Sequence, residues 1–167
     1  MQFDHRSGRR SAALRMLAAS RSLDVEETTV GRLGRARVGT VSAMSVKLGT
    51  VVVDCADPEA LSRFWCDVLE WHVVDRDDDG AVEIGPADQQ HLTLLFEPVP
   101  ERKTSKNRLH FDINPLRSDQ ETELERLLAL GARKVDLGQG DQSWVVLADP
   151  EGNEFCLLHT PVDDPAR

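Results

Sequence analysis

Apolar residues recur at helical spacing in two segments of the chain. In the first segment, residues 57–71, they fall three and four positions apart, at Leu61, Phe64, Trp65, Val68 and Leu69. This spacing puts them on one face of an α-helix. Asp57 stands where an N-cap residue accepts a backbone hydrogen bond, and Pro58 suits the first helical position. We therefore expect an amphipathic helix that begins at Pro58.

The second helical segment covers residues 118–132. Ser118 and Glu121 have the spacing of a capping box, which predicts the start of a helix. Gly131 predicts its end, because glycine readily takes the left-handed conformation that closes a helix. The apolar face of this helix is expected to consist of Leu124, Leu127 and Leu128.

Each predicted helix follows one predicted strand and precedes three. The strands around the first helix are expected at 48–54, 72–77, 80–85 and 91–98. Those around the second helix are expected at 109–114, 133–138, 143–148 and 154–161. Because equivalent strands lie about 60 residues apart, we infer a duplicated βαβββ module. The two modules are expected at about 46–98 and 107–161, within a domain that covers residues 44–167.

This arrangement predicts an α+β fold. A helix on one face of each small sheet leaves the other face free. Two such sheets side by side would form a curved mixed sheet, with the helices on its outer face. The open face would then be a cup that can enclose a small ligand.

The strand at 109–114 carries the first candidate chemistry. Leu109, Phe111 and Ile113 alternate with His110 and Asp112, so the apolar set is expected to face the helices. His110 and Asp112 would then face the cup, two residues apart on one strand, close enough to act as a pair. We expect them to be the catalytic or hydrogen-bonding groups of the site.

Charge is distributed unevenly along the chain. Residues 1–43 hold eight arginines and four acidic residues, a net charge of +4. The remaining residues hold 12 basic and 25 acidic side chains, a net charge of −13. A body this acidic repels a phosphate backbone, so we expect no nucleic-acid partner. We interpret residues 1–43 as a flexible basic extension, or as the product of an upstream start codon before Met44.

Other sequence features favour a cytoplasmic protein. No stretch approaches the length of apolar residues that a membrane-spanning helix needs, and residues 1–30 lack the apolar core of a signal peptide. The three cysteines, Cys55, Cys66 and Cys156, show no metal-binding or redox spacing and cannot all pair. We therefore expect reduced thiols and no membrane partner. A homodimer is the expected assembly.

Three motifs resemble those of the vicinal oxygen chelate superfamily. They are "DPEALSRFWCDVLEW" after the first strand, "KNRLHFDI" at the start of the second module and "WVVLADPEGNEFCLL" near its end. The resemblance covers about residues 46–161 and is nearest to the glyoxalase-like domain branch. The superfamily includes glyoxalase I, fosfomycin and bleomycin resistance proteins and extradiol dioxygenases. It implies the same paired-module fold and a small organic molecule as partner.

The resemblance also implies four metal-ligand positions, which here are Thr50, Thr93, His110 and Cys156. The family usually has His where Thr50 stands and Glu where Cys156 stands. Threonine hydroxyls are poor ligands for zinc or iron, which take about three ligands from His, Asp, Glu or Cys. We therefore expect no metal and no other cofactor. A shifted metal site built from His91, His110, Asp112 and Glu154 remains an alternative.

The expected site residues follow from these arguments. His110 and Asp112 would be catalytic, and the ligand-binding residues would be Thr50, Thr93, Trp144, Glu154 and Cys156. Trp144 either stacks on a ligand or belongs to the core. The leading hypothesis is a small-molecule binding protein, like bleomycin resistance relatives, or a metal-independent enzyme. The alternatives are a metal-dependent lyase or dioxygenase, and a non-catalytic interaction module whose cup is closed by side chains.

Overall fold

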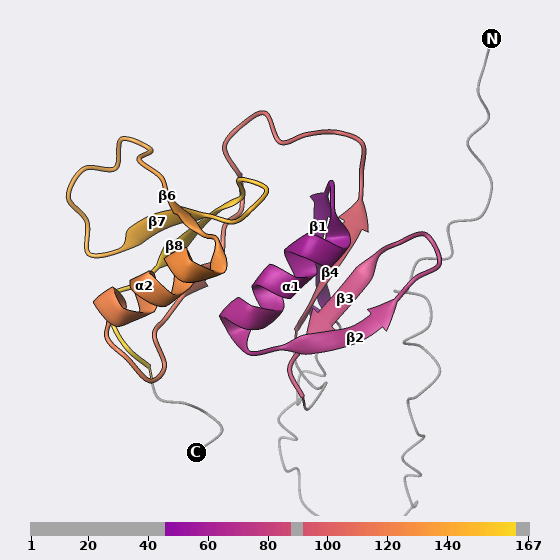
Figure 1. Cartoon of the computed structure of the whole chain (residues 1–167), viewed down its shortest axis with the longest axis horizontal. Coiled ribbons are helices and arrows are strands. Elements are labelled where there is room, and N and C mark those ends of the chain that lie inside the picture. Colours follow the sequence, from indigo (N-terminus) through magenta and orange to yellow (C-terminus); the bar gives the residue numbers. More distant parts are fainter. Residues whose placement is uncertain (1–45, 88–91, 163–167) are drawn as a thin grey trace, which may run out of the picture. The chain divides into compact units, whose positions relative to one another are not determined.

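The computed structural model describes residues 46–87 and 92–162 of the 167-residue chain. The predictions for residues 1–43 and for His91 fall outside the described residues. The two modules belong to one compact unit, residues 47–167. Figure 1 traces the first module from indigo to pink and the second from orange to yellow. Within the described residues, no helix has the length and apolar character needed to cross a membrane.

The first module is a four-stranded mixed sheet with one helix. Strand β1 runs parallel to β4, and β3 is antiparallel to both β4 and β2, which gives the order β1-β4-β3-β2. The elements are β1 Thr50–Cys55, α1 Pro58–Leu69, β2 His72–Arg76, β3 Val82–Gly85 and β4 Thr93–Pro98.

The second module repeats this topology with shorter strands. Its order is β5-β8-β7-β6, again with one parallel pair, β5 and β8. The elements are β5 Asp112–Ile113, α2 Gln120–Leu130, β6 Arg133–Lys134, β7 Val145–Ala148 and β8 Glu154–Leu157. The predicted α+β class and the duplicated βαβββ module are confirmed. The two sheets remain separate and do not close into one.

Helix α1 begins where the sequence predicts. The Asp57 side chain accepts a hydrogen bond from the Ala60 amide at 2.9 Å, and Pro58 opens the first turn. Its apolar face is buried, as predicted, through Leu61, Phe64, Trp65 and Val68. The carboxylate of Glu151, from the second module, accepts further hydrogen bonds from the Ala56 and Asp57 amides. An acidic side chain there also interacts favourably with the positive end of the helix dipole.

Helix α2 departs from the prediction at its start. The N-cap residue is Asp119, not Ser118, because the Asp119 carboxylate accepts from the Thr122 amide at 2.8 Å. That backbone hydrogen bond holds the pKa of Asp119 below its ordinary value. Gly131 ends the helix with a φ of 111°, as predicted. The predicted apolar face is too wide: Leu127 is fully buried, whereas Leu128 is exposed to solvent.

Trp65 of α1 joins the cores of the two modules. Its ring lies edge-to-face against Phe111 and Phe155 of the second module, with ring centroids 5.3 and 5.1 Å apart. Its indole nitrogen donates to the buried carboxylate of Asp149 at 3.3 Å. Burial raises the pKa of Asp149, although hydrogen bonds from Asn153, Trp65 and the Glu151 amide oppose that rise. Helix α1 therefore packs on its own sheet and on the second module.

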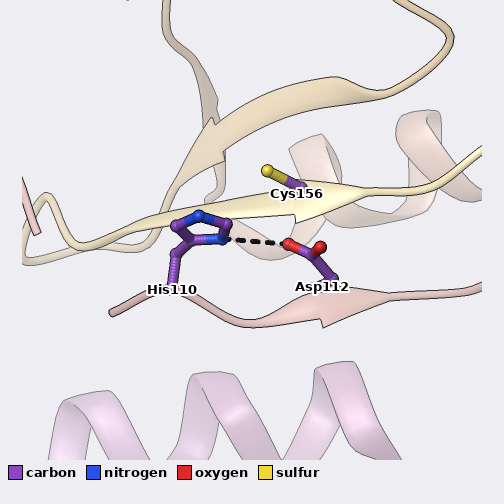
Figure 2. A group of neighbouring side chains, drawn as sticks. All are labelled: His110, Asp112 and Cys156. Carbon is purple, nitrogen blue, oxygen red and sulfur yellow. Dashed lines mark hydrogen bonds and ion pairs between the residues drawn. The ribbon is translucent and has the colours of Figure 1, made fainter. Parts of the chain in front are cut away.

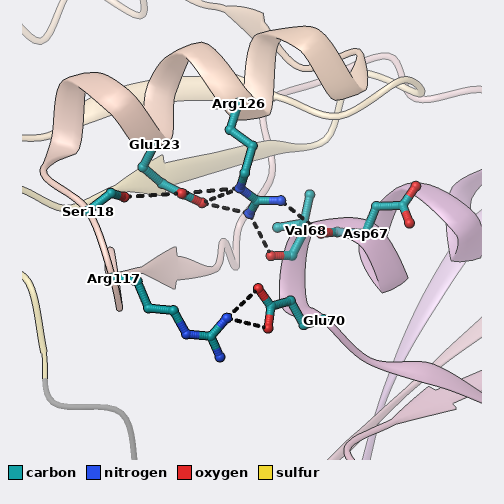
Figure 3. Close-up of polar contacts among 7 residues, drawn as sticks. All are labelled: Asp67, Val68, Glu70, Arg117, Ser118, Glu123 and Arg126. Carbon is teal, nitrogen blue, oxygen red and sulfur yellow. Dashed lines mark hydrogen bonds and ion pairs between the residues drawn. The ribbon is translucent and has the colours of Figure 1, made fainter.

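A cluster of polar contacts connects the end of α1 with α2 (Figure 3). The Arg126 guanidinium donates to the backbone carbonyls of Asp67 and Val68, both at 2.9 Å. The same guanidinium pairs with Glu123 one turn earlier on its own helix, at 2.6 Å. Donors at this point satisfy carbonyls that the last turn of α1 leaves without intrahelical partners.

The predicted strand at 109–114 is shorter than expected. Pairing with β8 begins where the Phe111 carbonyl accepts from the Cys156 amide at 2.8 Å. Phe111 and Ile113 pack against the core, as predicted. The prediction for Leu109 is wrong, because this side chain is 85% exposed. It precedes the paired residues, so nothing in the sheet fixes which face it takes.

Candidate functional site

Strand alternation gives the second sheet two distinct faces. On β8, Phe155 and Leu157 point into the core that contains Trp65. Successive side chains on a strand point to opposite faces, so Glu154 and Cys156 lie on the other face. On β5, Phe111 likewise faces the core. The polar residues of both strands therefore share the face that the helices leave free.

A cavity of about 390 Å³ lies on this face. Every residue that lines it belongs to the second module or to the segment that precedes β5. They are Lys106, His110, Asp112, Leu137, Gln139, Trp144, Val146, Glu154, Phe155, Cys156 and Leu158. The cavity thus contains five of the seven predicted site residues.

His110, Asp112 and Cys156 form a group at the cavity wall (Figure 2). The imidazole Nδ1 and a carboxylate oxygen of Asp112 are 2.9 Å apart. Asp112 is paired in register with Cys156 across β5 and β8. One nitrogen, oxygen or sulfur atom from each of the three residues lies within 4.8 Å of the others. An ionised carboxylate only accepts hydrogen bonds, so Nδ1 carries the proton in this pair and Nε2 faces away from Asp112.

The Cys156 side chain is a poor nucleophile in this setting. Burial raises the pKa of its thiol, and the negative charge and hydrogen bond of Asp112 raise it further. Lys106 acts in the opposite sense, but as a smaller influence. A thiol that stays protonated at neutral pH has little nucleophilic character. Cys156 therefore serves as a weakly polar part of the wall.

Glu154 lies at the cavity, but its carboxylate is already engaged. The Lys103 ammonium lies 3.0 Å from Oε2, and the Asn107 amide donates to the same oxygen at 2.9 Å. Burial opposes the charge on Glu154, but these donors outweigh it and hold its pKa below the ordinary value. The carboxylate thus holds the segment between the modules, which leaves it little capacity to bind a ligand.

Part of the cavity lining is apolar. Trp144 is 38% exposed and stands at the cavity, outside the buried core. Leu137, Val146 and Leu158 are further apolar lining residues. Together these side chains give the cavity a hydrophobic surface in addition to the polar group of His110 and Asp112.

Thr50 and Thr93 lie elsewhere, on the first sheet. Their hydroxyl oxygens are 2.9 Å apart, and the Thr93 hydroxyl donates to the carboxylate of Glu83 at 2.6 Å. Neither residue lines the cavity on the second sheet. Among the described residues, no hydrogen bond or ion pair joins them to His110 or Asp112. The single cup expected from the sequence does not gather all seven residues within one chain.

The four family metal positions therefore do not fit a metal together, because the two threonines are weak donors and do not reach the cavity. The group of His110, Asp112 and Cys156 fits better, since it offers one nitrogen, one oxygen and one sulfur. Zinc bonds of about 2.0–2.3 Å require ligand atoms roughly 3.3–3.8 Å apart. The spacing of up to 4.8 Å would have to contract slightly.

Sequence reasoning missed several residues around these sites. Val146 and Leu158 could have been found, because each lies two residues from a predicted site residue on the same strand face. Glu83 also carried a signal, as an acidic residue between buried Val82 and Ile84. Lys106 carried none, since its place depends on how the segment before β5 folds.

A larger cavity, of about 450 Å³, lies between α1 and α2. Its charged lining residues pair with one another, as in the contact of Arg117 with Glu70 at 2.9 Å. Its lining includes no histidine or cysteine. We therefore place the candidate site in the smaller cavity, where a titratable pair and an apolar wall meet.

Comparisons with known proteins agree with this fold. Residues 50–158 match the family model described as a glyoxalase-like domain. No curated protein matches the chain. Among solved structures, the fosfomycin resistance protein FosX of Listeria monocytogenes, crystallised with Mn(II), has 14% identity and a TM-score of 0.53, over 72% of this chain and 93% of that one. FosX of Mesorhizobium loti has 17% identity and a TM-score of 0.50, over 72% and 94%.

A glyoxalase/bleomycin resistance protein/dioxygenase family enzyme of Burkholderia phytofirmans has 19% identity and a TM-score of 0.51, over 67% of this chain and 97% of that one. At these identities the structural matches establish the fold alone. The family model covers more than half of the chain. The chain belongs to the glyoxalase-like domain family, within the vicinal oxygen chelate superfamily.

Proposed function

We propose that the cavity on the second sheet binds a small organic molecule, and that His110 is its main polar contact. The observation that carries this proposal is the 2.9 Å pair of His110 and Asp112 at the wall of a cavity of about 390 Å³. Ligand sites in proteins combine an apolar surface with a few convergent polar groups. Trp144 and its neighbours supply the apolar surface here.

The pairing defines what His110 does. Asp112 accepts the Nδ1 proton, which fixes the orientation of the ring and leaves Nε2 available to a ligand. In its neutral form Nε2 accepts a hydrogen bond or a proton from the ligand. In its protonated form it donates to a carbonyl or carboxylate oxygen. The same geometry thus serves a binding protein and an acid/base enzyme that needs no metal.

Replacement of His110 tests this proposal. His110→Ala is expected to leave the fold intact, because the side chain contributes no core volume. It should weaken binding of small aromatic acids by about 1.5–3 kcal/mol, the usual contribution of a hydrogen bond to a charged group. Calorimetric titration measures this loss, with His72→Ala on the first sheet as the matched control. Unchanged binding, or an unfolded variant, would make His110 a structural residue.

A metal centre is the second candidate, and the convergence of His110, Asp112 and Cys156 favours it. A bound divalent ion would act there as a Lewis acid toward a ligand oxygen. The raised pKa of Cys156 works against this candidate, because a thiol must lose its proton to bind a metal. We therefore retain the metal-independent function as the leading proposal.

Metal content separates the two candidates. Elemental analysis of protein purified without chelator is expected to find well below one equivalent of zinc, iron, manganese or nickel. One full equivalent that is lost in His110→Ala and Asp112→Ala, but kept in His72→Ala, would establish the metal centre. The alternative of a closed interaction module predicts neither metal nor small-molecule binding.

We also propose a homodimer. The first sheet leaves Thr50 outside the cavity, and its neighbour Val52 on the same strand face is 50% exposed. A second copy could cover this face. Sedimentation velocity should show a dimer that Val52→Asp dissociates, and a monomer at all concentrations would refute it.

The three free thiols support the cytoplasm as location. The acidic body supports the absence of a nucleic-acid partner.

A further inference from the structure

The segment that links the modules is fastened to the second sheet at two points. Both fastenings use Glu154 of β8: the Lys103 ammonium binds its carboxylate at 3.0 Å, and the Asn107 amide donates to it at 2.9 Å. Lys103 also donates to the Ser105 carbonyl at 2.6 Å, which folds the segment back on itself. The Lys103 and Glu154 side chains are only 22% and 11% exposed. Partial burial makes such a pair firmer than an ordinary surface ion pair.

Lys106 lies between these fastened residues and lines the cavity. Within residues 46–87 and 92–162, its ammonium makes no hydrogen bond or ion pair. The positive charge of Lys106 nonetheless acts inside the cavity. It lowers the pKa of the Cys156 thiol, although burial has the larger, opposite effect. The contacts of Glu154 with Lys103 and Asn107 therefore hold the unpaired ammonium group of Lys106 at the cavity.

Neither carboxylate at the cavity is paired with this cation. Glu154 binds Lys103, and Asp112 accepts a hydrogen bond from His110 while keeping its own negative charge. Lys106 is left as the one lining group with a full positive charge and no partner among the described residues. A ligand with a single negative charge matches it better than a dianion, because a second negative charge would face Asp112. The wall formed by Trp144, Leu137 and Leu158 matches a flat, apolar body.

We propose that the ligand is a monoanionic carboxylate with an aromatic body, that Lys106 recognises its carboxylate, and that Glu154 is the positioning residue that holds Lys106 in place. This inference rests on the proposed function, since it assumes that the cavity binds a small molecule. It adds the chemical class of that molecule and gives Glu154 a role other than direct contact with the ligand.

Matched pairs of probes test the charge preference. Benzoate, 1-naphthoate and 2-naphthoate differ from their carboxamides in charge but hardly in shape. The full-length protein should bind at least one carboxylate about tenfold or more tightly than its amide, measured by calorimetry. Lys106→Ala should reduce carboxylate binding to the level of the amide and leave the amide unchanged. Arg108→Ala, which removes the same charge from the same segment without lining the cavity, should preserve the preference.

Glu154→Gln tests the positioning role. It keeps the shape of the side chain but sets an amide against the Lys103 ammonium. Amide hydrogen exchange at residues 103–107 should become faster, and the carboxylate preference should fall severalfold. Exchange that stays at the wild-type rate, with the preference intact, would refute the role of Glu154.

The outcomes separate this inference from the proposed function. Amides that bind as tightly as carboxylates, or a preference that survives Lys106→Ala, overturn the inference and leave the cavity a small-molecule site. Failure of all six probes to bind overturns the inference and counts equally against the proposed binding function. A carboxylate preference that depends on Lys106 but not on His110 supports the inference and refutes the role proposed for His110.

Discussion

His110 and Asp112 are distinguished from other exposed polar residues by their pairing at a cavity wall. A hydrogen bond of 2.9 Å fixes the ring that would otherwise rotate freely at the surface. Such fixation reduces the entropy that a ligand would lose in ordering the side chain. The pair therefore explains why a half-exposed histidine can be a specific contact.

The reactivity of the Cys156 thiol reports the negative charge of Asp112 at this site. Asp112→Asn removes the negative charge that helps to raise the pKa of the Cys156 thiol, and it leaves burial unchanged. We expect alkylation of Cys156 by iodoacetamide at pH 8 to become faster, since a lower thiol pKa increases the fraction of reactive thiolate. Peptide mass spectrometry measures the rate. Asp141→Asn, a surface control, should leave the rate unchanged, and an equal rate in all three proteins would contradict the assigned contact.

The lowered pKa of Glu154 makes the stability of the folded protein depend on pH in the acidic range. Its folded-state pKa lies below the ordinary glutamate value of 4.5, so the ionised form stabilises the folded state at neutral pH. That contribution is complete above 4.5 and is lost as the pH falls through the lowered pKa. The melting temperature of Glu154→Gln should therefore lie below that of the wild type at pH 6, and the gap should narrow as the pH falls well below 4.5. A gap that stays constant with pH would show that the charge contributes nothing.

At the scale of elements, α1 holds the two modules together. It buries one face on its own sheet, and Trp65 extends this contact to Phe111 and Phe155. Glu151 and Arg126, both from the second module, bind the backbone at its two ends. Helix α1 thus contacts the second module at its start, middle and end.

Arg126→Ala tests the fastening at the end of α1. The change leaves the carbonyls of Asp67 and Val68 without these donors and leaves Glu123 without its partner. We expect a loss of roughly 1–2 kcal/mol in the free energy of unfolding, reduced from the fully buried value because the site is partly solvated. Urea denaturation measures it. Arg63→Ala removes an exposed arginine of α1 and should change stability little; equal losses in both variants would contradict the account.

The local elements were predictable because their signals are local. Asp57 and Pro58 start α1, and Gly131 ends α2, by chemistry that acts within one helical turn. Leu109 was misjudged because alternation predicts a face only where a partner strand pairs with the residue. The N-cap of α2 was misjudged by one residue, since Ser118 and Asp119 are both good caps.

The site was predictable only in part, for the same reason. Strand alternation put His110, Asp112, Glu154 and Cys156 on one face, because alternation depends on the strand alone. Strand alternation could not reveal that Asn107 and Lys103 bind the carboxylate of Glu154, since these contacts join residues about 50 positions apart. It also could not reveal that Trp65 packs across the modules.

At the scale of the molecule, the body and the N-terminal segment are expected to be independent. The predicted boundary near residue 44 remains a prediction, drawn from the absence of apolar periodicity in residues 1–43. Deleting those residues should leave the melting temperature nearly unchanged, as differential scanning calorimetry can measure. A fall of more than about 5 °C, roughly 1 kcal/mol for a domain of this size, would show that they pack on the body.

We place ligand binding in the cavity on the free face of the second sheet. Backbone amide chemical shifts in NMR spectra, recorded while the tightest of the aryl carboxylates is added, test this most directly. We expect shifts that cluster at residues 106–112, 137–146 and 154–158, in the segments that line this cavity. Shifts confined to the first sheet, or to the larger cavity between α1 and α2, would contradict it.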